Sequence, residues 1–128
     1  MAKHCTVLVV EDEPLIRWDL TERLEQTGCQ TLEAGSAEEA ISILEIRPDI
    51  TVVFTDIQMP GTMDGIQLAQ FVRKRWPPTI IVISSGRVEP KRDVLAEDIV
   101  FVAKPYNNKV LSSVIAEVRQ RLANPPST

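Results

Sequence analysis

Short β-branched runs alternate along the chain with longer segments whose apolar residues recur every three or four positions. This alternation is typical of a parallel β-sheet with helices on both faces. Three of the runs are almost continuously apolar, as strands buried on both faces should be. The five predicted strands are residues 6–10, 30–33, 50–55, 79–83 and 99–103. We therefore expect an α/β fold with a doubly wound, five-stranded parallel sheet.

Residues that favour helix ends delimit the first two helices. Pro14 suits a first helical turn, and Gly28 suits the position just after a helix. The second helix begins with a capping-box pattern, because Ser36 is followed three residues later by Glu39, and it ends before Pro48. Both segments are therefore predicted to be helices.

The later helices differ in how clearly they are marked. One is expected over about residues 64–76, and the last, which follows the capping residue Asn107, has a broad apolar stripe. Between them, Gly86 and Pro90 leave room for about two turns, so we expect this crossover helix to be short or irregular. The residues expected to face the sheet are Ile16, Leu20, Leu24, Ala37, Ala40, Ile41, Leu44, Leu68, Phe71, Val72, Val110, Leu111, Val114, Ile115, Val118 and Leu122.

The composition fits one modest domain. The 128 residues include 14 basic and 18 acidic side chains, which gives a net charge of −4 with the histidine neutral. We predict a domain over residues 1–123 and a short Pro-rich tail over 124–128. The acidic balance argues against nucleic-acid binding, no apolar run has the length of a membrane span, and the N-terminus lacks a signal-peptide pattern. A cytoplasmic protein is expected.

The two cysteines are expected to be buried thiols. Cys5 and Cys29 do not have the spacing of metal ligands, and disulfides are rare in a reducing compartment. His4 lacks the Cys or His neighbours in sequence that a metal site would need. We therefore assign no redox or metal chemistry to these three residues.

Polar side chains follow four of the predicted strands. They are Glu11, Asp12 and Glu13 after the first strand, Asp56 after the third, Ser84 and Ser85 after the fourth, and Lys104 after the fifth. Ligands bind at this edge of a doubly wound sheet. Carboxylates about 4 Å apart repel by about 4 kcal/mol at an effective dielectric of about 20, so the group should recruit a cation. Carboxylates without His or Cys suit Mg²⁺, and an ammonium and a hydroxyl beside them suit a phosphoryl group.

Five short motifs occur in order along the chain. They are Val9-Val10-Glu11-Asp12-Glu13-Pro14, Thr55-Asp56-Ile57-Gln58-Met59-Pro60-Gly61, Met63-Asp64-Gly65, Ile83-Ser84-Ser85 and Lys104-Pro105. Together they resemble the receiver domains of two-component response regulators, of the single-domain chemotaxis-regulator kind, over essentially the whole chain. The resemblance implies a flavodoxin-like sheet with strand order 2-1-3-4-5. It also implies a bacterial signalling protein.

The resemblance further implies that Asp56 accepts a phosphoryl group from a phosphohistidine, and that the chain then changes conformation to regulate a partner. The donor would be a sensor histidine kinase or a histidine phosphotransfer protein. Mg²⁺ would be held by Asp12, Asp56, the backbone carbonyl of Gln58 and, through a water, Glu11. Such a chain catalyses its own phosphorylation and dephosphorylation without conventional substrate turnover, as a monomer or weak dimer.

Further roles carried over from the family fall on the last two strands. Lys104 and Ser84 would bind the phosphoryl oxygens, Phe101 would act with Ser84 as the switch, and the Lys104-Pro105 peptide would be cis. Plain core packing is the alternative for Phe101. The sequence departs from the common pattern because Ser84 replaces a threonine, Phe101 lacks a tyrosine hydroxyl, and Thr62 lengthens the loop after the third strand.

Two other functions are compatible with such a sheet. A Mg²⁺-dependent phosphatase that forms an aspartyl-phosphate from free substrates usually has an Asp-x-Asp pair, but position 58 is Gln. A flavin or nucleotide binder needs Gly and free N–H groups at the first turn, where this chain has acidic residues. The signalling receiver is the preferred hypothesis, either alone or as part of a longer regulator.

Overall fold

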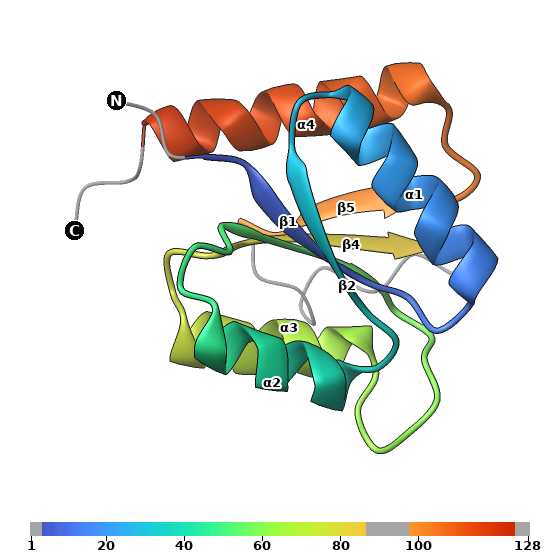
Figure 1. The fold of residues 1–128 in the computed structure, drawn as a ribbon, viewed down its shortest axis with the longest axis vertical. Coiled ribbons are helices and arrows are strands. Elements are labelled where there is room, and N and C mark those ends of the chain that lie inside the picture. Colours follow the sequence, from blue (N-terminus) through green and yellow to red (C-terminus); the bar gives the residue numbers. More distant parts are fainter. Residues whose placement is uncertain (1–3, 87–97, 125–128) are drawn as a thin grey trace.

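Five parallel strands form one sheet at the centre of the molecule (Figure 1). The computed structural model describes residues 4–86 and 98–124. The strands are β1 (Thr6–Val10), β2 (Gln30–Ala34), β3 (Val52–Asp56), β4 (Ile80–Ser85) and β5 (Val100–Ala103). They lie in the order β2-β1-β3-β4-β5, and each adjacent pair is parallel. The predicted fold class and strand order are confirmed.

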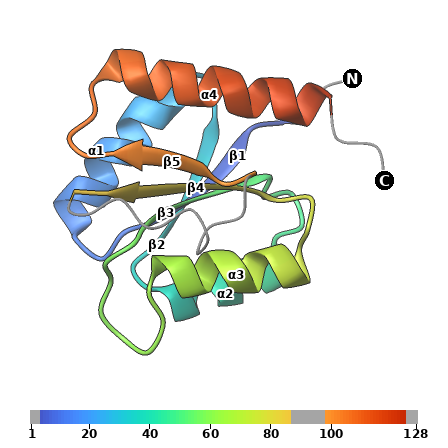
Figure 2. The same cartoon turned by 180° about the vertical axis from the view of Figure 1, so that it is seen from behind.

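Four helices of the described residues cover the two faces of the sheet. They are α1 (Pro14–Gln26), α2 (Ala37–Ile46), α3 (Gly65–Arg75) and α4 (Asn108–Ala123). Figures 1 and 2 show α1 and α4 on one face, and α2 and α3 on the other. None of them is long and apolar enough to span a membrane. The short or irregular helix expected after Gly86 lies outside the described residues.

Alternate residues of the strands enter two separate hydrophobic cores. In β1, Val7 and Val9 pack with residues of α1 and α4, whereas Leu8 and Val10 pack with residues of α2 and α3. All four are essentially inaccessible to solvent, and burial of such a side chain stabilises the fold by roughly 1.5–3 kcal/mol. This packing on both faces explains why the run of β1 is continuously apolar.

Side chains cap the starts of α2, α3 and α4, with one difference from the prediction. Ser36 Oγ accepts a hydrogen bond from the Glu39 N–H at 3.1 Å, as predicted for α2. The Glu39 carboxylate, however, accepts from the N–H of Gly35. The reciprocal capping box occurs instead at α3, between Asp64 and Gln67.

Two residues predicted to face the sheet are exposed instead. Ile16 is 47% exposed and Val110 is 42% exposed. Both lie in the first turn of their helix, at the edge of the sheet where the strands end, so little sheet surface remains to cover them. Phe71 is partly buried, with its ring centroid 6.1 Å from that of Trp76.

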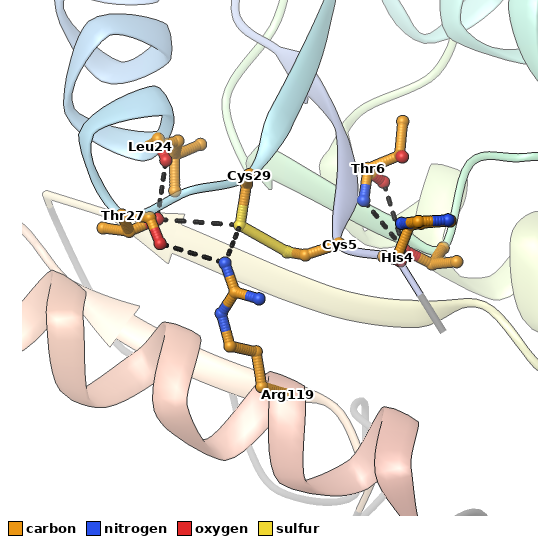
Figure 3. Close-up of a disulfide and its surroundings, with 8 residues drawn as sticks. His4, Cys5, Thr6, Leu24, Thr27, Cys29 and Arg119 are labelled. Carbon is orange, nitrogen blue, oxygen red and sulfur yellow. Dashed lines mark hydrogen bonds between the residues drawn. A yellow bond between two sulfur atoms is a disulfide. The ribbon is translucent and has the colours of Figure 1, made fainter. Parts of the chain in front are cut away.

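Cys5 and Cys29 form a disulfide, so the prediction of free thiols is wrong (Figure 3). The register of β1 and β2 pairs Thr6 with Gln30, which makes the two preceding cysteines neighbours. Their Cα atoms are 4.9 Å apart, within the range that a disulfide spans. Both residues are buried, as predicted.

The disulfide lies against the C-terminal helix. The Arg119 guanidinium of α4 donates to the Thr27 carbonyl at 2.9 Å and contacts Cys29 Sγ at 3.6 Å. Figure 3 shows the arginine reaching from α4 to the turn that joins α1 to β2. The disulfide therefore lies beneath a contact between α4 and the turn after α1, at the amino-terminal ends of the strands.

Candidate functional site

The carboxyl ends of the strands gather the predicted site residues at one edge of the sheet. Asp56 is the last residue of β3, and it pairs in register with Ser84 of β4. Two further backbone hydrogen bonds extend the sheet at this edge. The Glu11 N–H donates to the Ala34 carbonyl at 3.0 Å, and the Lys104 N–H donates to the Ser85 carbonyl at 2.9 Å. Because the strands are parallel, these ends necessarily share one edge.

One ammonium joins two carboxylates at this edge. Lys104 Nζ lies 3.2 Å from Asp56 Oδ2 and 3.5 Å from Glu11 Oε1. The Asp56 side chain is 15% exposed and that of Glu11 only 6%. Lys104 therefore offsets part of the repulsion between two acids that are shielded from water.

The carboxylate of Glu11 is fixed by a hydrogen bond and by an ion pair. Its Oε2 accepts from the Glu13 N–H at 3.0 Å. Burial raises the pKa of the Glu11 carboxyl above its ordinary value, although the hydrogen bond from Glu13 and the charge of Lys104 oppose this shift. The directly following residue, Asp12, is exposed. The two acids at the end of β1 therefore occupy different environments, one buried and one facing water.

The residues at and after the ends of β1 and β3 offer oxygen atoms of the kind that suit a hard cation. Asp12 and Gln58 line an open hollow together with residues of the loop after β3, namely Ile57, Met59, Pro60 and Asp64. Within the described residues, no three His, Cys, Asp or Glu side chains gather as a ready-made metal cage. Mg²⁺ commonly uses one or two carboxylates and keeps several waters. The oxygens of Asp12, Asp56 and the Gln58 carbonyl fit that requirement.

The loop between β3 and α3 packs tightly on the Asp56 backbone. A Cβ at Gly65 would lie 2.0 Å from the Asp56 carbonyl oxygen, so only glycine fits there. The Gly65 N–H donates to the Ile57 carbonyl at 2.8 Å. Farther along the loop, the Thr62 hydroxyl donates to Glu38 Oε2 of α2 at 2.6 Å. These contacts set the path of the chain that carries Gln58.

The other residues singled out in the sequence lie on β4, on β5 and just after β5. Ser84 is buried, and Phe101 is partly buried and pairs in register with Ile83. The Lys104-Pro105 peptide is cis, as expected. The edge therefore brings Ser84 and Lys104 to Asp56, while Phe101 lies farther back along its strand.

Sequence reasoning missed two contributors to this region. Arg17 Nη1 donates to the Glu11 carbonyl at 2.8 Å, and long polar side chains on a helix give no pattern that would reveal such a bond. Tyr106 packs its ring against Phe54, with centroids 6.3 Å apart, and burial raises the pKa of its hydroxyl to about 12. Its position two residues after Lys104 was the available signal.

Comparison with known proteins agrees with this geometry. The chain matches the response regulator receiver domain family over residues 7–116. It is 36% identical over 107 residues to the transcriptional regulatory protein PdtaR of Mycobacterium tuberculosis. The aligned region covers 79% of this chain and 50% of that protein. The chain spans half or less of the length of such curated relatives.

Solved structures share the whole fold. A response regulator receiver domain protein from Clostridium thermocellum superposes with a TM-score of 0.83 at 28% identity, covering 91% of this chain and 95% of that one. The response regulator TrrA of Thermotoga maritima, solved in complex with Mg²⁺ and BeF, gives a TM-score of 0.80 at 28% identity, covering 89% and 98%. The chain therefore belongs to the receiver domains of two-component response regulators.

Proposed function

We propose that this chain is a phosphorylation-dependent receiver in which Asp56 accepts a phosphoryl group from a phosphohistidine on a sensor kinase or histidine phosphotransfer protein. The observation that carries the proposal is the contact of 3.2 Å between the Asp56 carboxylate and the Lys104 ammonium at the end of the central strand. Membership of the receiver family supports the same reading.

The transfer exchanges one bond to phosphorus for another. A carboxylate oxygen of Asp56 attacks the phosphorus and forms the new P–O bond. The bond between phosphorus and the histidine nitrogen breaks, its electron pair stays on the nitrogen, and the imidazole takes up a proton as it leaves. Lys104 can follow the negative charge from the carboxylate to the phosphoryl oxygens, because its ammonium already lies beside Asp56. The Ser84 hydroxyl supplies a second donor.

A divalent cation fits the same edge. Asp12, Asp56 and the Gln58 carbonyl would hold Mg²⁺ directly, and Glu11 would do so through a water. When bound, the ion supplies positive charge that offsets the phosphoryl oxygens. The buried position of Glu11 and its bond to the Glu13 N–H keep this acid in place while Asp12 remains accessible.

Signalling would follow from the added charge. A phosphoryl group brings about −1.5 to −2 charges to Asp56, and the expected response is a shift of Lys104, Ser84 and the switch residue Phe101. Reversing a conformational population from 1:99 to 99:1 takes about 5.5 kcal/mol. A few charge-assisted hydrogen bonds, each worth roughly 1.5–3 kcal/mol, supply that amount.

Labelling with a small phosphodonor tests the assignment. Incubation with acetyl phosphate and Mg²⁺ should give one acid-stable, base-labile phosphate per chain, and Asp56→Asn should abolish it. Asp49→Asn is the matched control, since Asp49 forms a surface ion pair with Arg47, and this variant should label like the native chain. Undiminished labelling of Asp56→Asn would refute the site. Sustained turnover of many phosphate esters would instead favour the phosphatase alternative.

A further inference from the structure

The guanidinium of Arg17 holds two groups at once. Its Nη1 donates to the Glu11 backbone carbonyl at 2.8 Å, and its Nε donates to Glu33 Oε1 of β2 at 3.0 Å. We propose that Arg17 is a positioning residue, which fixes the peptide between Glu11 and Asp12 and so sets where the Asp12 carboxylate lies. The inference rests on the proposed function, in which Asp12 holds Mg²⁺.

The bond matters because it fixes the backbone that carries Asp12. The Glu11 N–H is bound to the Ala34 carbonyl, and its carboxylate is bound to the Glu13 N–H. The Glu11 carbonyl is the remaining polar group of this residue, and it accepts from Arg17. With both ends of Glu11 fixed, the plane of the next peptide is fixed as well. Asp12 therefore starts from a defined backbone position although its side chain is exposed.

Glu33 makes the arrangement compatible with a cation. A free guanidinium beside a metal site would repel the ion. Here the Glu33 carboxylate neutralises Arg17, whose side chain is only 22% exposed. Arginine suits the task because its planar fork donates in two fixed directions, whereas a lysine ammonium is a single point. Arg17→Lys should therefore lose the simultaneous grip on the Glu11 carbonyl and on Glu33.

Gly35 leaves room for the guanidinium. A Cβ at this position would lie 3.3 Å from Arg17 Nη1 and 3.8 Å from Glu39 Oε1. Gly35→Ala would crowd Arg17 and change no charge. It is therefore a second way to disturb the same bond, independent of removing the arginine.

Metal affinity is the direct readout. Binding of Mn²⁺ to the full chain can be followed by the paramagnetic signal of the free ion, and the affinity for Mg²⁺ by competition. Residues that orient metal ligands typically change affinity 10- to 100-fold. We expect about a tenfold loss for Arg17→Ala, a similar loss for Arg17→Lys, and a smaller one for Gly35→Ala. Arg47→Ala, which breaks a surface pair with Asp49, should bind like the native chain.

A second measurement separates positioning from general damage. With acetyl phosphate, Arg17→Ala should need more Mg²⁺ to reach half its maximal labelling rate, and the rate at saturating Mg²⁺ should return to within about twofold of native. A fall in the maximal rate without a change in the Mg²⁺ requirement would overturn the inference, and so would an equal loss of affinity in Arg47→Ala.

The inference and the proposed function fail differently. If Asp12→Ala loses the metal while Arg17→Ala and Gly35→Ala keep native affinity, Arg17 does not position the site and the proposed function stands. If the native chain binds neither ion, both are wrong.

Discussion

Removal of the disulfide should cost a calculable part of the stability. The cross-link joins residues 24 positions apart, and the chain-entropy model gives about 3.5 kcal/mol for a loop of that size. For a domain of this length the unfolding entropy is roughly 2.1 cal/mol/K per residue, so the midpoint of thermal unfolding should fall by about 13 °C. Reduction of the native chain should produce this loss.

Urea unfolding of two proteins under two conditions isolates the cross-link. The native chain and the double variant Cys5→Ala with Cys29→Ala are compared with and without a thiol reductant. The reductant should lower the free energy of unfolding of the native chain by about 3.5 kcal/mol and leave the variant unchanged. Loss of the buried sulfur atoms is common to both conditions, so it cancels in this difference.

Two results would refute the reasoning. Alkylation of the unfolded, unreduced native chain should find no free thiol, and two free thiols would mean that no cross-link exists. If mass measurement confirms the bond but the reductant changes the free energy of unfolding of native and variant chains equally, the disulfide does not stabilise the fold by restricting the unfolded chain. Labelling of Asp56 should be insensitive to the reductant, because the disulfide lies at the opposite edge of the sheet.

Two more predictions concern Gly65 and Tyr106. Gly65→Ala places a Cβ 2.0 Å from the Asp56 carbonyl oxygen, so it should cost about 1–3 kcal/mol of stability and slow labelling of Asp56. Gly86→Ala is the control, because its Cβ would lie in ordinary contact at 3.5 Å from Lys104 Cβ, and it should change neither property. Unchanged unfolding and labelling in Gly65→Ala would contradict this prediction. The pKa of Tyr106 is raised from 10.0 to about 12, so the unfolded chain releases this proton first and the free energy of unfolding should fall as pH rises through that interval. Tyr106→Phe should lack this component, and parallel urea-unfolding curves for the two proteins across that interval would disprove it.

The sequence pattern was sufficient to predict features that depend on a local run of residues. The apolar run of β1 has the predicted bounds, and Asp56 lies at the end of β3 as the alternation required. The disulfide could not be predicted, because it depends on the register between two strands, and Cys29 alone shows no partner. Arg17 was missed for a related reason: its target is a backbone carbonyl, which every residue carries, so no sequence pattern distinguishes it.

The exposed residues at the helix starts show a different limit. Ile16 and Leu20 lie on the same helix face, yet the first is 47% exposed and the second is buried. Helical periodicity gives the direction of a side chain but not how far the sheet extends beneath it. The length of the strands relative to the helices decides burial at the ends, and that relation appears only in three dimensions.

The position of β2 has a consequence for contacts between molecules. Among the described strands it is an outer one, with a neighbour on one side only. Such a sheet edge is a template on which another chain can form intermolecular β-structure. Here the strand has only five residues, and it carries the charged Glu33 in an ion pair with Arg17. The disulfide at Cys29 fastens its start to the neighbouring chain segment. A short, charged and anchored edge strand of this kind is a poor template for such pairing.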